Sequence, residues 1–189
     1  MPEKQKPETK PEDKIKAEQK VKAHFSRENV YSEDHESKNV YDQSRFGELK
    51  DSKVSYSLVE ALYLLEKRKM DVYDGKKALT YENFLKKAKK IQPNFWVRYS
   101  VFRDLRSRGY IVKTALKFGA DFRVYDRGIK PGEDHAKWIV FPVHESETLT
   151  WYEWAANNRV EHSTIKRLLM AVVDEEGDVS YWEARWIRP

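Results

Sequence analysis

Three side chains that can move protons or stabilise negative charge stand beside apolar runs in the second half of this sequence. Tyr125 lies at the end of the run DFRVYD, His135 comes just before WIVFPVH, and Lys166 comes just before LLMAVV. A phenol, an imidazole and an ammonium group can supply a base, an acid and a cation to a reaction in which negative charge develops. The sequence therefore places one complete set of acid–base groups near predicted strand ends.

The loop DRGIKPGED separates Tyr125 from His135. Its two glycines and its proline favour a sharp and exposed turn, which brings the ends of the loop near each other. We expect both side chains to face one cleft at the edge of a sheet, with Lys166 at the start of a strand beside them. Each residue also has an ordinary interpretation, as a packing tyrosine, a loop or core histidine and a solvated lysine, and the spacing alone does not decide between the two.

Positive charge is concentrated around the same loop. Residues 98–137 hold ten Lys or Arg against five Asp or Glu, and this difference equals the net charge of +5 of the whole 189-residue chain. A basic region that also contains Trp, Tyr and Phe suits a phosphate-bearing polyanion whose bases can stack. A solvated face of a lysine-rich protein is the alternative explanation.

Composition excludes several classes of protein. The chain has no cysteine, so disulfides, thiol nucleophiles and cysteine-based zinc sites are excluded. No run approaches the ~20 consecutive apolar residues of a membrane span, and the N-terminal segment MPEKQKPETKPEDK lacks the apolar core of a signal peptide. We expect a soluble protein of the cytoplasm.

The pattern of the chain predicts a mixed α/β protein of the α+β class. Residues 1–22 read as a disordered charged tail, residues 23–93 as a small N-terminal α/β domain, and residues 94–189 as a C-terminal domain with a mixed sheet. A capping-box pattern, with Glu60 three residues after Ser57, predicts a helix from Ser57, and Thr150 with Glu153 heads another over WYEWAANN. Helices are also expected over YENFLKKAKKI and over NFWVRYSVFRDLRSR up to Gly109, where Phe95, Tyr99 and Phe102 recur at helical spacing. Five strand-like runs follow Gly109, and the turn EEGD joins the last two.

Two long blocks resemble a known family. Two blocks strongly resemble the catalytic domain of the archaeal tRNA-splicing endonucleases, namely GYIVKTALKFGADFRVYDRGIKPGEDHAKWIV and IKRLLMAVVDEEGDVSYWEARW. The N-terminal domain of that family resembles another part of the chain, NVYDQSRFGEL followed by SLVEALYLLEKRK. The resemblance implies a C-terminal mixed sheet flanked by helices, similar to restriction endonucleases. Residues 1–38 look like an extension without a counterpart in the family.

The resemblance also implies a metal-free catalytic triad and no cofactor. The matching positions are Tyr125 as general base on the ribose 2′-hydroxyl, His135 as general acid for the leaving 5′-oxygen, and Lys166 as the cation that stabilises the pentacoordinate phosphorane. A phenol has an ordinary pKa of about 10, so such a base needs a nearby cation, which Lys166 can supply. The products would be a 2′,3′-cyclic phosphate and a 5′-hydroxyl.

In this family an arginine and a tryptophan grip an extruded base. Arg159 and Trp186 match these positions best, while Arg167 and Trp182 are competing candidates. The alternative for Trp186 is packing against the last strand.

The implied substrate is precursor tRNA with a bulge-helix-bulge at the exon–intron junctions, whose unstacked nucleotides can reach in-line geometry. Two scissile bonds require at least two active chains, so the resemblance implies a homotetramer, or a heterotetramer with a non-catalytic subunit. In the family an acidic loop docks on a neighbouring subunit. The turn that matches it carries Asp174, Glu175, Glu176 and Asp178. A simple exposed hairpin tip is the alternative.

Two other functions stay open at this point. The chain could be a non-catalytic RNA-binding or structural subunit of the same assembly, although its complete triad favours catalysis. It could also be a metal-dependent DNA nuclease of related fold. That function would need acidic residues from two adjoining strands, and only the loop segment GEDHAK offers acids near the predicted cleft.

Overall fold

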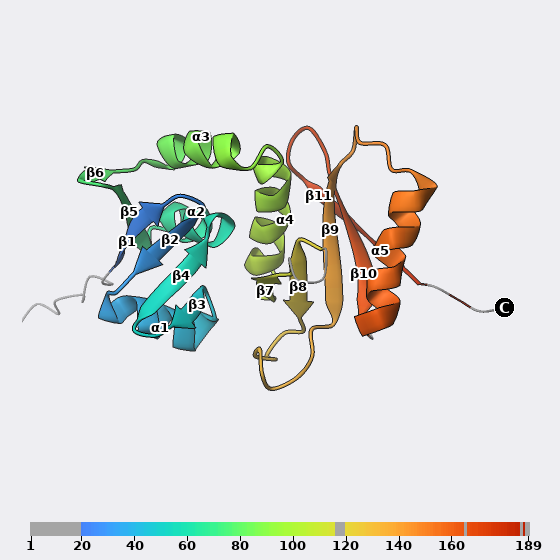
Figure 1. Ribbon diagram of the computed structural model, residues 1–189, viewed down its shortest axis with the longest axis horizontal. Coiled ribbons are helices and arrows are strands. Elements are labelled where there is room, and N and C mark those ends of the chain that lie inside the picture. The colour runs from blue at the N-terminus through green and yellow to red at the C-terminus, as the bar shows by residue number, and fades with distance from the viewer. Residues whose placement is uncertain (1–19, 116–119, 165, 186, 188–189) are drawn as a thin grey trace, which may run out of the picture.

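The computed structural model describes residues 20–115, 120–164, 166–185 and 187, and arranges them around two sheets with a helix between them (Figure 1). The first sheet has the strand order β3-β4-β2-β1-β5-β6. Its strands are β1 (Val21–Ser26), β2 (Asn29–Ser32), β3 (Glu48–Lys50), β4 (Lys53–Ser57), β5 (Met70–Asp74) and β6 (Lys77–Ala78). The helices of this half are α1 (His35–Ser44), α2 (Leu58–Glu66) and α3 (Tyr81–Ile91).

Strand β1 forms because its apolar residues alternate with polar ones. Val21, Ala23 and Phe25 point into the core, while the residues between them are exposed. β1 pairs antiparallel with β2 and parallel with β5, so it lies in the middle of its sheet. It begins inside the segment that the sequence predicts to be a tail, and the structure therefore extends the ordered fold back to at least Val21.

Helix α2 begins with the capping box predicted from the sequence. The carboxylate of Glu60 accepts hydrogen bonds from the backbone N–H of Ser57 at 3.0 Å and from its hydroxyl at 2.8 Å. Glu60 is itself buried and also accepts from the backbone N–H of Gly47 at 2.9 Å. The cap thus fixes both the helix start and the loop that leads into β3.

Helix α4 (Phe95–Ser107) packs against both halves of the chain. Phe95, Tyr99 and Phe102 are fully buried on it, and Phe102 lies against Tyr63 of α2 and Phe122 of the second sheet. The buried apolar residues of the two halves consequently form one continuous cluster.

The second sheet has the strand order β11-β10-β9-β8-β7. Its strands are β7 (Ile111–Thr114), β8 (Phe122–Tyr125), β9 (Trp138–His144), β10 (Arg167–Val173) and β11 (Val179–Ala184), and helix α5 (Trp151–Thr164) connects β9 to β10. β9 and β10 are parallel, and the other neighbours are antiparallel. The predicted mixed α+β class is therefore confirmed.

The two helices of this half cover opposite faces of the second sheet (Figure 1). Val140 belongs to the apolar cluster that includes α4, whereas its neighbour Ile139 belongs to a second cluster with Trp154 of α5. This alternation follows from the two-residue repeat of a strand. The boundary near residue 93 between two domains stays a prediction.

Candidate active site

Tyr125 lies at the carboxyl end of β8, with its side chain buried to 5% exposure. Phe122 and Val124 face the α4 side of the sheet, so Arg123 and Tyr125 share the other face. β8 runs antiparallel to β9, which means that the end of β8 lies beside the beginning of β9. The tyrosine is therefore at the edge of the sheet where β9 starts.

The loop 126–137 returns the chain to that same edge. The ammonium group of Lys137 lies 2.7 Å from the carboxylate of Asp126, and the Lys137 backbone N–H donates to the Val124 carbonyl at 2.8 Å. The hydrogen bond from Lys137, together with that from the Arg127 backbone, holds the pKa of Asp126 below its ordinary value. As expected from the sequence, the ends of this loop are brought together.

His135 is exposed near the end of the loop, two residues before Lys137. Its backbone N–H donates to the carboxylate of Asp134 at 2.6 Å, and the next residue, Ala136, is buried. The backbone around the histidine is thus anchored, while the imidazole stays accessible to solvent.

Lys166 stands immediately before β10 and is half-buried. The backbone N–H of Arg167 donates to the Lys137 carbonyl at 3.0 Å, and Arg167 is the register partner of Trp138 in parallel β9. Because β9 and β10 are parallel, the residues that precede them lie at one edge of the sheet. His135 and Lys166 consequently approach the end of β8 from two adjacent strands.

The structure brings all three predicted residues into one cleft of about 370 Å³. Tyr125, His135 and Lys166 line this cleft, and the other described residues that line it are Arg123, Gly132, Glu133, Asp134 and Ala136. Such an arrangement offers a phenol, an imidazole and two cationic groups to a bound anion. Arg123 did not emerge from the sequence as a site residue, although its position two residues before Tyr125 predicts the same face.

Of the two residues predicted to grip a base, the structure describes only Arg159. Arg159 is exposed on α5 and is not among the described residues that line the cleft, and Trp186 lies outside the described residues. Of the competing candidates, Arg167 forms an ion pair with Glu183 at 3.5 Å, and Trp182 is 67% exposed on β11. The assignment of Arg159 and Trp186 stays a prediction.

The acidic turn connects β10 to β11. The backbone N–H of Asp178 donates to the Asp174 carboxylate at 2.8 Å, and Gly177 adopts a φ of +86° beneath the tip. Glu175 and Glu176 are exposed. Because β10 leads from Lys166 to this turn over seven residues, the turn is on the order of 25 Å from the cleft, at the opposite edge of the sheet (Figure 1).

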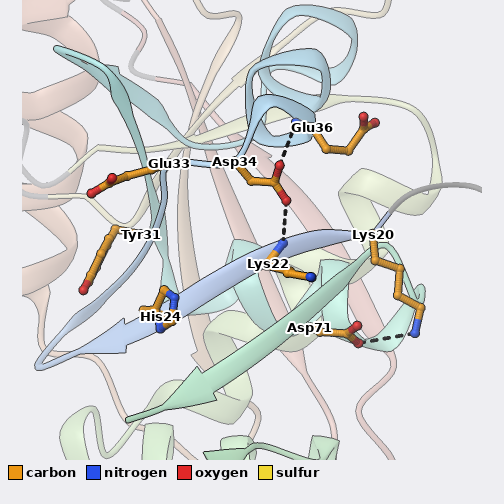
Figure 2. Close-up of a pocket in the computed structure, with 8 residues that line it drawn as sticks. All are labelled: Lys20, Lys22, His24, Tyr31, Glu33, Asp34, Glu36 and Asp71. Atoms are coloured by element: carbon orange, nitrogen blue, oxygen red, sulfur yellow. Dashed lines mark hydrogen bonds and ion pairs between the residues drawn. The ribbon is translucent and has the colours of Figure 1, made fainter. Parts of the chain in front are cut away.

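A larger cavity, of about 890 Å³, lies on the exposed face of the first sheet (Figure 2). Its carboxylates are engaged locally, since Asp71 pairs with Lys20 at 3.3 Å and Asp34 accepts from the backbone of Lys22 and of Glu36. The three predicted catalytic residues are not among those that line it. We therefore place the candidate active site at the smaller cleft, where acid–base groups converge.

Comparison with known proteins assigns both halves of the chain. The family model for the tRNA intron endonuclease, catalytic C-terminal domain, matches residues 95–181, and the model for the N-terminal domain of the same endonuclease matches residues 21–85. The chain belongs to the tRNA intron endonuclease family. The second half of the chain, which contains the cleft, is therefore the half that matches the catalytic domain of the family.

Individual relatives agree with this assignment. A tRNA-splicing endonuclease of Pyrococcus furiosus is 41% identical over 169 residues, which cover 89% of this chain and 97% of the relative. A tRNA-splicing endonuclease of Nanoarchaeum equitans is 44% identical over 138 residues, covering 70% and 88%. One from Methanothermobacter thermautotrophicus is 36% identical over 152 residues, covering 80% and 88%.

The comparison corrects one expectation. Residues 1–38 were expected to be an extension without a counterpart, but the N-terminal family model already matches from residue 21. Strand β1 starts at the same residue, because its alternating apolar side chains complete the first sheet.

In the described part of the chain, no helix is long and apolar enough to cross a membrane.

Proposed function

We propose that this protein cuts precursor tRNA at the two bulges of a bulge-helix-bulge, using Tyr125, His135 and Lys166 and no metal ion. The observation that carries the proposal is the convergence of these three side chains in one cleft of the catalytic half of the chain. The names of the relatives, which are tRNA-splicing endonucleases, support precursor tRNA as the substrate. We expect the protein to act in the cytoplasm.

The proposed reaction needs two proton transfers and the stabilisation of one excess negative charge. Tyr125 takes the proton of the 2′-hydroxyl, whose oxygen attacks the adjacent phosphorus. The bond from phosphorus to the 5′-oxygen of the next nucleotide breaks, and His135 gives that oxygen a proton. Lys166 stabilises the phosphorane that forms between these steps. One strand ends in a 2′,3′-cyclic phosphate and the other begins with a 5′-hydroxyl, so atoms and charges balance without water.

We further propose that the active form is a tetramer. One chain carries one Tyr125–His135–Lys166 triad, whereas a bulge-helix-bulge has two scissile bonds, so at least two active chains must face one RNA. The assembly then contains either four copies or two copies together with a non-catalytic partner. The exposed acidic turn, which carries Asp174, Glu175, Glu176 and Asp178, would dock on a neighbouring subunit.

The experiment compares cleavage of a bulge-helix-bulge RNA by wild type, His135→Ala and the control His35→Ala in excess EDTA. His35 is also an exposed histidine, but it lies on α1 and outside the cleft. We expect His135→Ala to bind the RNA normally and to cut it ~10²-fold more slowly or worse, because only the proton donor is lost. His35→Ala should behave like wild type.

Two results would contradict the proposal. Cleavage by a folded His135→Ala at the wild-type rate would remove this histidine from the mechanism. A wild-type protein that cuts pre-folded RNA only after magnesium is restored would exclude metal-independent cleavage.

A further inference from the structure

Arg123 projects into the cleft beside Tyr125 and has no role in the chemistry described above. The two residues share a face of β8 and are separated by roughly 7 Å along the strand. Arg123 also has cross-strand partners in register, Lys113 on β7 and Ile139 on β9, so the backbone on both sides fixes its position. The guanidinium group is therefore built into the wall of the cleft.

Among the residues that the structure describes, the guanidinium of Arg123 has no anionic partner. Three arginines of the described chain bury their Nε atom without a hydrogen bond: Arg45, Arg98 and Arg123. Arg45 forms an ion pair with Asp42, and Arg98 with Asp121 at 2.6 Å. Among the described residues, no carboxylate lies within 4.0 Å of the Arg123 nitrogens. A buried donor without a partner is unusual, and it requires a structural or functional explanation.

The charged groups around Arg123 do not supply the missing partner. The nearest residue in register, Lys113, is itself a cation, and after the dominant effect of burial the charge of Arg123 contributes to lowering the Lys113 pKa. Two acids line the cleft, but Asp134 accepts from the His135 backbone and Glu133 accepts from the Lys130 backbone. An anion that enters the cleft would meet a partly buried guanidinium group that no described carboxylate pairs with.

We propose that Arg123 is a substrate-binding residue that donates to a phosphate oxygen of the RNA strand held in the cleft. The inference rests on the proposed function, because it takes RNA as the occupant of this site. A planar guanidinium group suits phosphate, to which it can donate two parallel hydrogen bonds. Since Arg123 lies within about 7 Å of Tyr125, the phosphate would be the scissile one or an immediate neighbour.

The test measures equilibrium binding of a bulge-helix-bulge RNA that carries 2′-deoxyribose at both cleavage positions, so that binding is seen without cleavage. Arg123→Met keeps most of the aliphatic stem and removes the charge, and Arg123→Lys keeps the charge but not the planar fork. Arg27→Met is the matched control, because Arg27 is an exposed arginine of the β1–β2 turn. Affinity is measured over a series of salt concentrations, and melting temperatures confirm folding.

We expect Arg123→Met to bind about 10- to 100-fold more weakly than wild type. The slope of log affinity against log salt should fall by about 0.7, which corresponds to one lost phosphate contact on single-stranded RNA. Arg123→Lys should keep the slope and lose part of the affinity, because a lysine offers a point charge only. The control should match wild type in both measurements.

The proposal is overturned if folded Arg123→Met has the affinity and salt slope of Arg27→Met. Should Arg123→Met not fold, Arg123→Gln is measured in its place under the same criterion. The two proposals can fail separately. If wild type does not cut the unmodified RNA, the proposed function fails. If wild type cuts it while the Arg123 variants bind normally, only the role of Arg123 fails.

Discussion

Strand direction, rather than proximity in the sequence, brings Tyr125, His135 and Lys166 into one cleft. The tyrosine ends β8, while the histidine and the lysine precede the parallel strands β9 and β10. Each side chain stands at a different strand end, and backbone hydrogen bonds of His135, Lys137 and Arg167 anchor the chain around them. Substitution of one residue should therefore leave the positions of the other two unchanged, which makes single variants interpretable.

The hydroxyl of Tyr125 can be removed without opening the core. We expect Tyr125→Phe to retain the wild-type melting temperature, since the buried ring is kept, and to cut RNA ~10²-fold more slowly or worse, since the proposed base is lost. Single-turnover cleavage and thermal unfolding are the two measurements. Tyr110→Phe is the control, because this half-buried tyrosine does not line the cleft. Equal cleavage rates for the two variants would exclude Tyr125 as the base.

The site could be predicted from the sequence only as far as residue types and strand ends allow. A tyrosine, a histidine and a lysine beside three apolar runs could be recognised because the loop between the first two must turn. Arg123 could not be identified as a site residue, because a polar residue between two apolar ones, here Phe122 and Val124, is the ordinary pattern of a strand with one exposed face. That no described carboxylate pairs with it depends on which acids the fold brings near, and this is a property of tertiary structure.

At the scale of elements, the sequence predicted those helices that have a capping pattern or a regular apolar spacing. The capping box at Ser57 and the apolar spacing of α4 are confirmed, as is the hydrogen bond from the Thr150 backbone to Glu153 at 2.8 Å that begins α5. Strands β1 and β2 were not predicted. Both strands are short, and β1 directly follows a highly charged segment, so their alternation gave a weak signal; in the structure β1 also pairs with distant β5.

The acidic turn allows a test of assembly at this scale. Asp174 is excluded from the test because its carboxylate accepts a hydrogen bond within the hairpin, so we reverse only the exposed Glu175 and Glu176 to lysine. If the protein assembles as proposed, we expect the proposed tetramer to dissociate and cleavage to be lost, since charge pairs buried between subunits fix the partner and can contribute several kcal/mol. The matched control reverses two other exposed carboxylates, Glu28 and Glu147.

Light scattering gives the mass of each variant, and circular dichroism confirms that the fold is retained. An intact tetramer that still cuts RNA after reversal of Glu175 and Glu176 would disprove docking through the acidic turn. Dissociation of the control variant as well would indicate a general effect of charge.

At the scale of the whole molecule, a buried ion pair connects the two halves. Lys113 of β7 lies 3.7 Å from Glu60 of α2 and also donates to the Gly47 carbonyl, and both charged residues are less than 10% exposed. Burial lowers the pKa of Lys113, and the negative charge of Glu60 opposes that shift. Since these contacts join β7 of the second sheet to α2 and to the loop before β3, we expect the chain to unfold as one unit.

Removal of Lys113 tests this connection. Lys113→Met leaves the Glu60 carboxylate buried without its cation, so we expect a loss of about 3–5 kcal/mol in the free energy of unfolding. The double variant Glu60→Gln with Lys113→Met should recover part of that loss, because the carboxylate that lost the Lys113 cation is then replaced by a neutral amide. Denaturant unfolding, followed by tryptophan fluorescence and by circular dichroism, measures both. A single variant as stable as wild type would show that the pair does not stabilise the folded chain.

The central position of β1 in the first sheet also sets an order of events during synthesis. Val21 is the register partner of Met70, so the parallel partner of β1 leaves the ribosome roughly fifty residues later. At elongation rates of about 5–20 residues per second, β1 waits on the order of several seconds for that partner. Meanwhile Val21, Ala23 and Phe25 have only β2 beside them. Nascent chains that stall before β5 therefore expose an apolar strand, and they should depend more on chaperones than chains that stall after it.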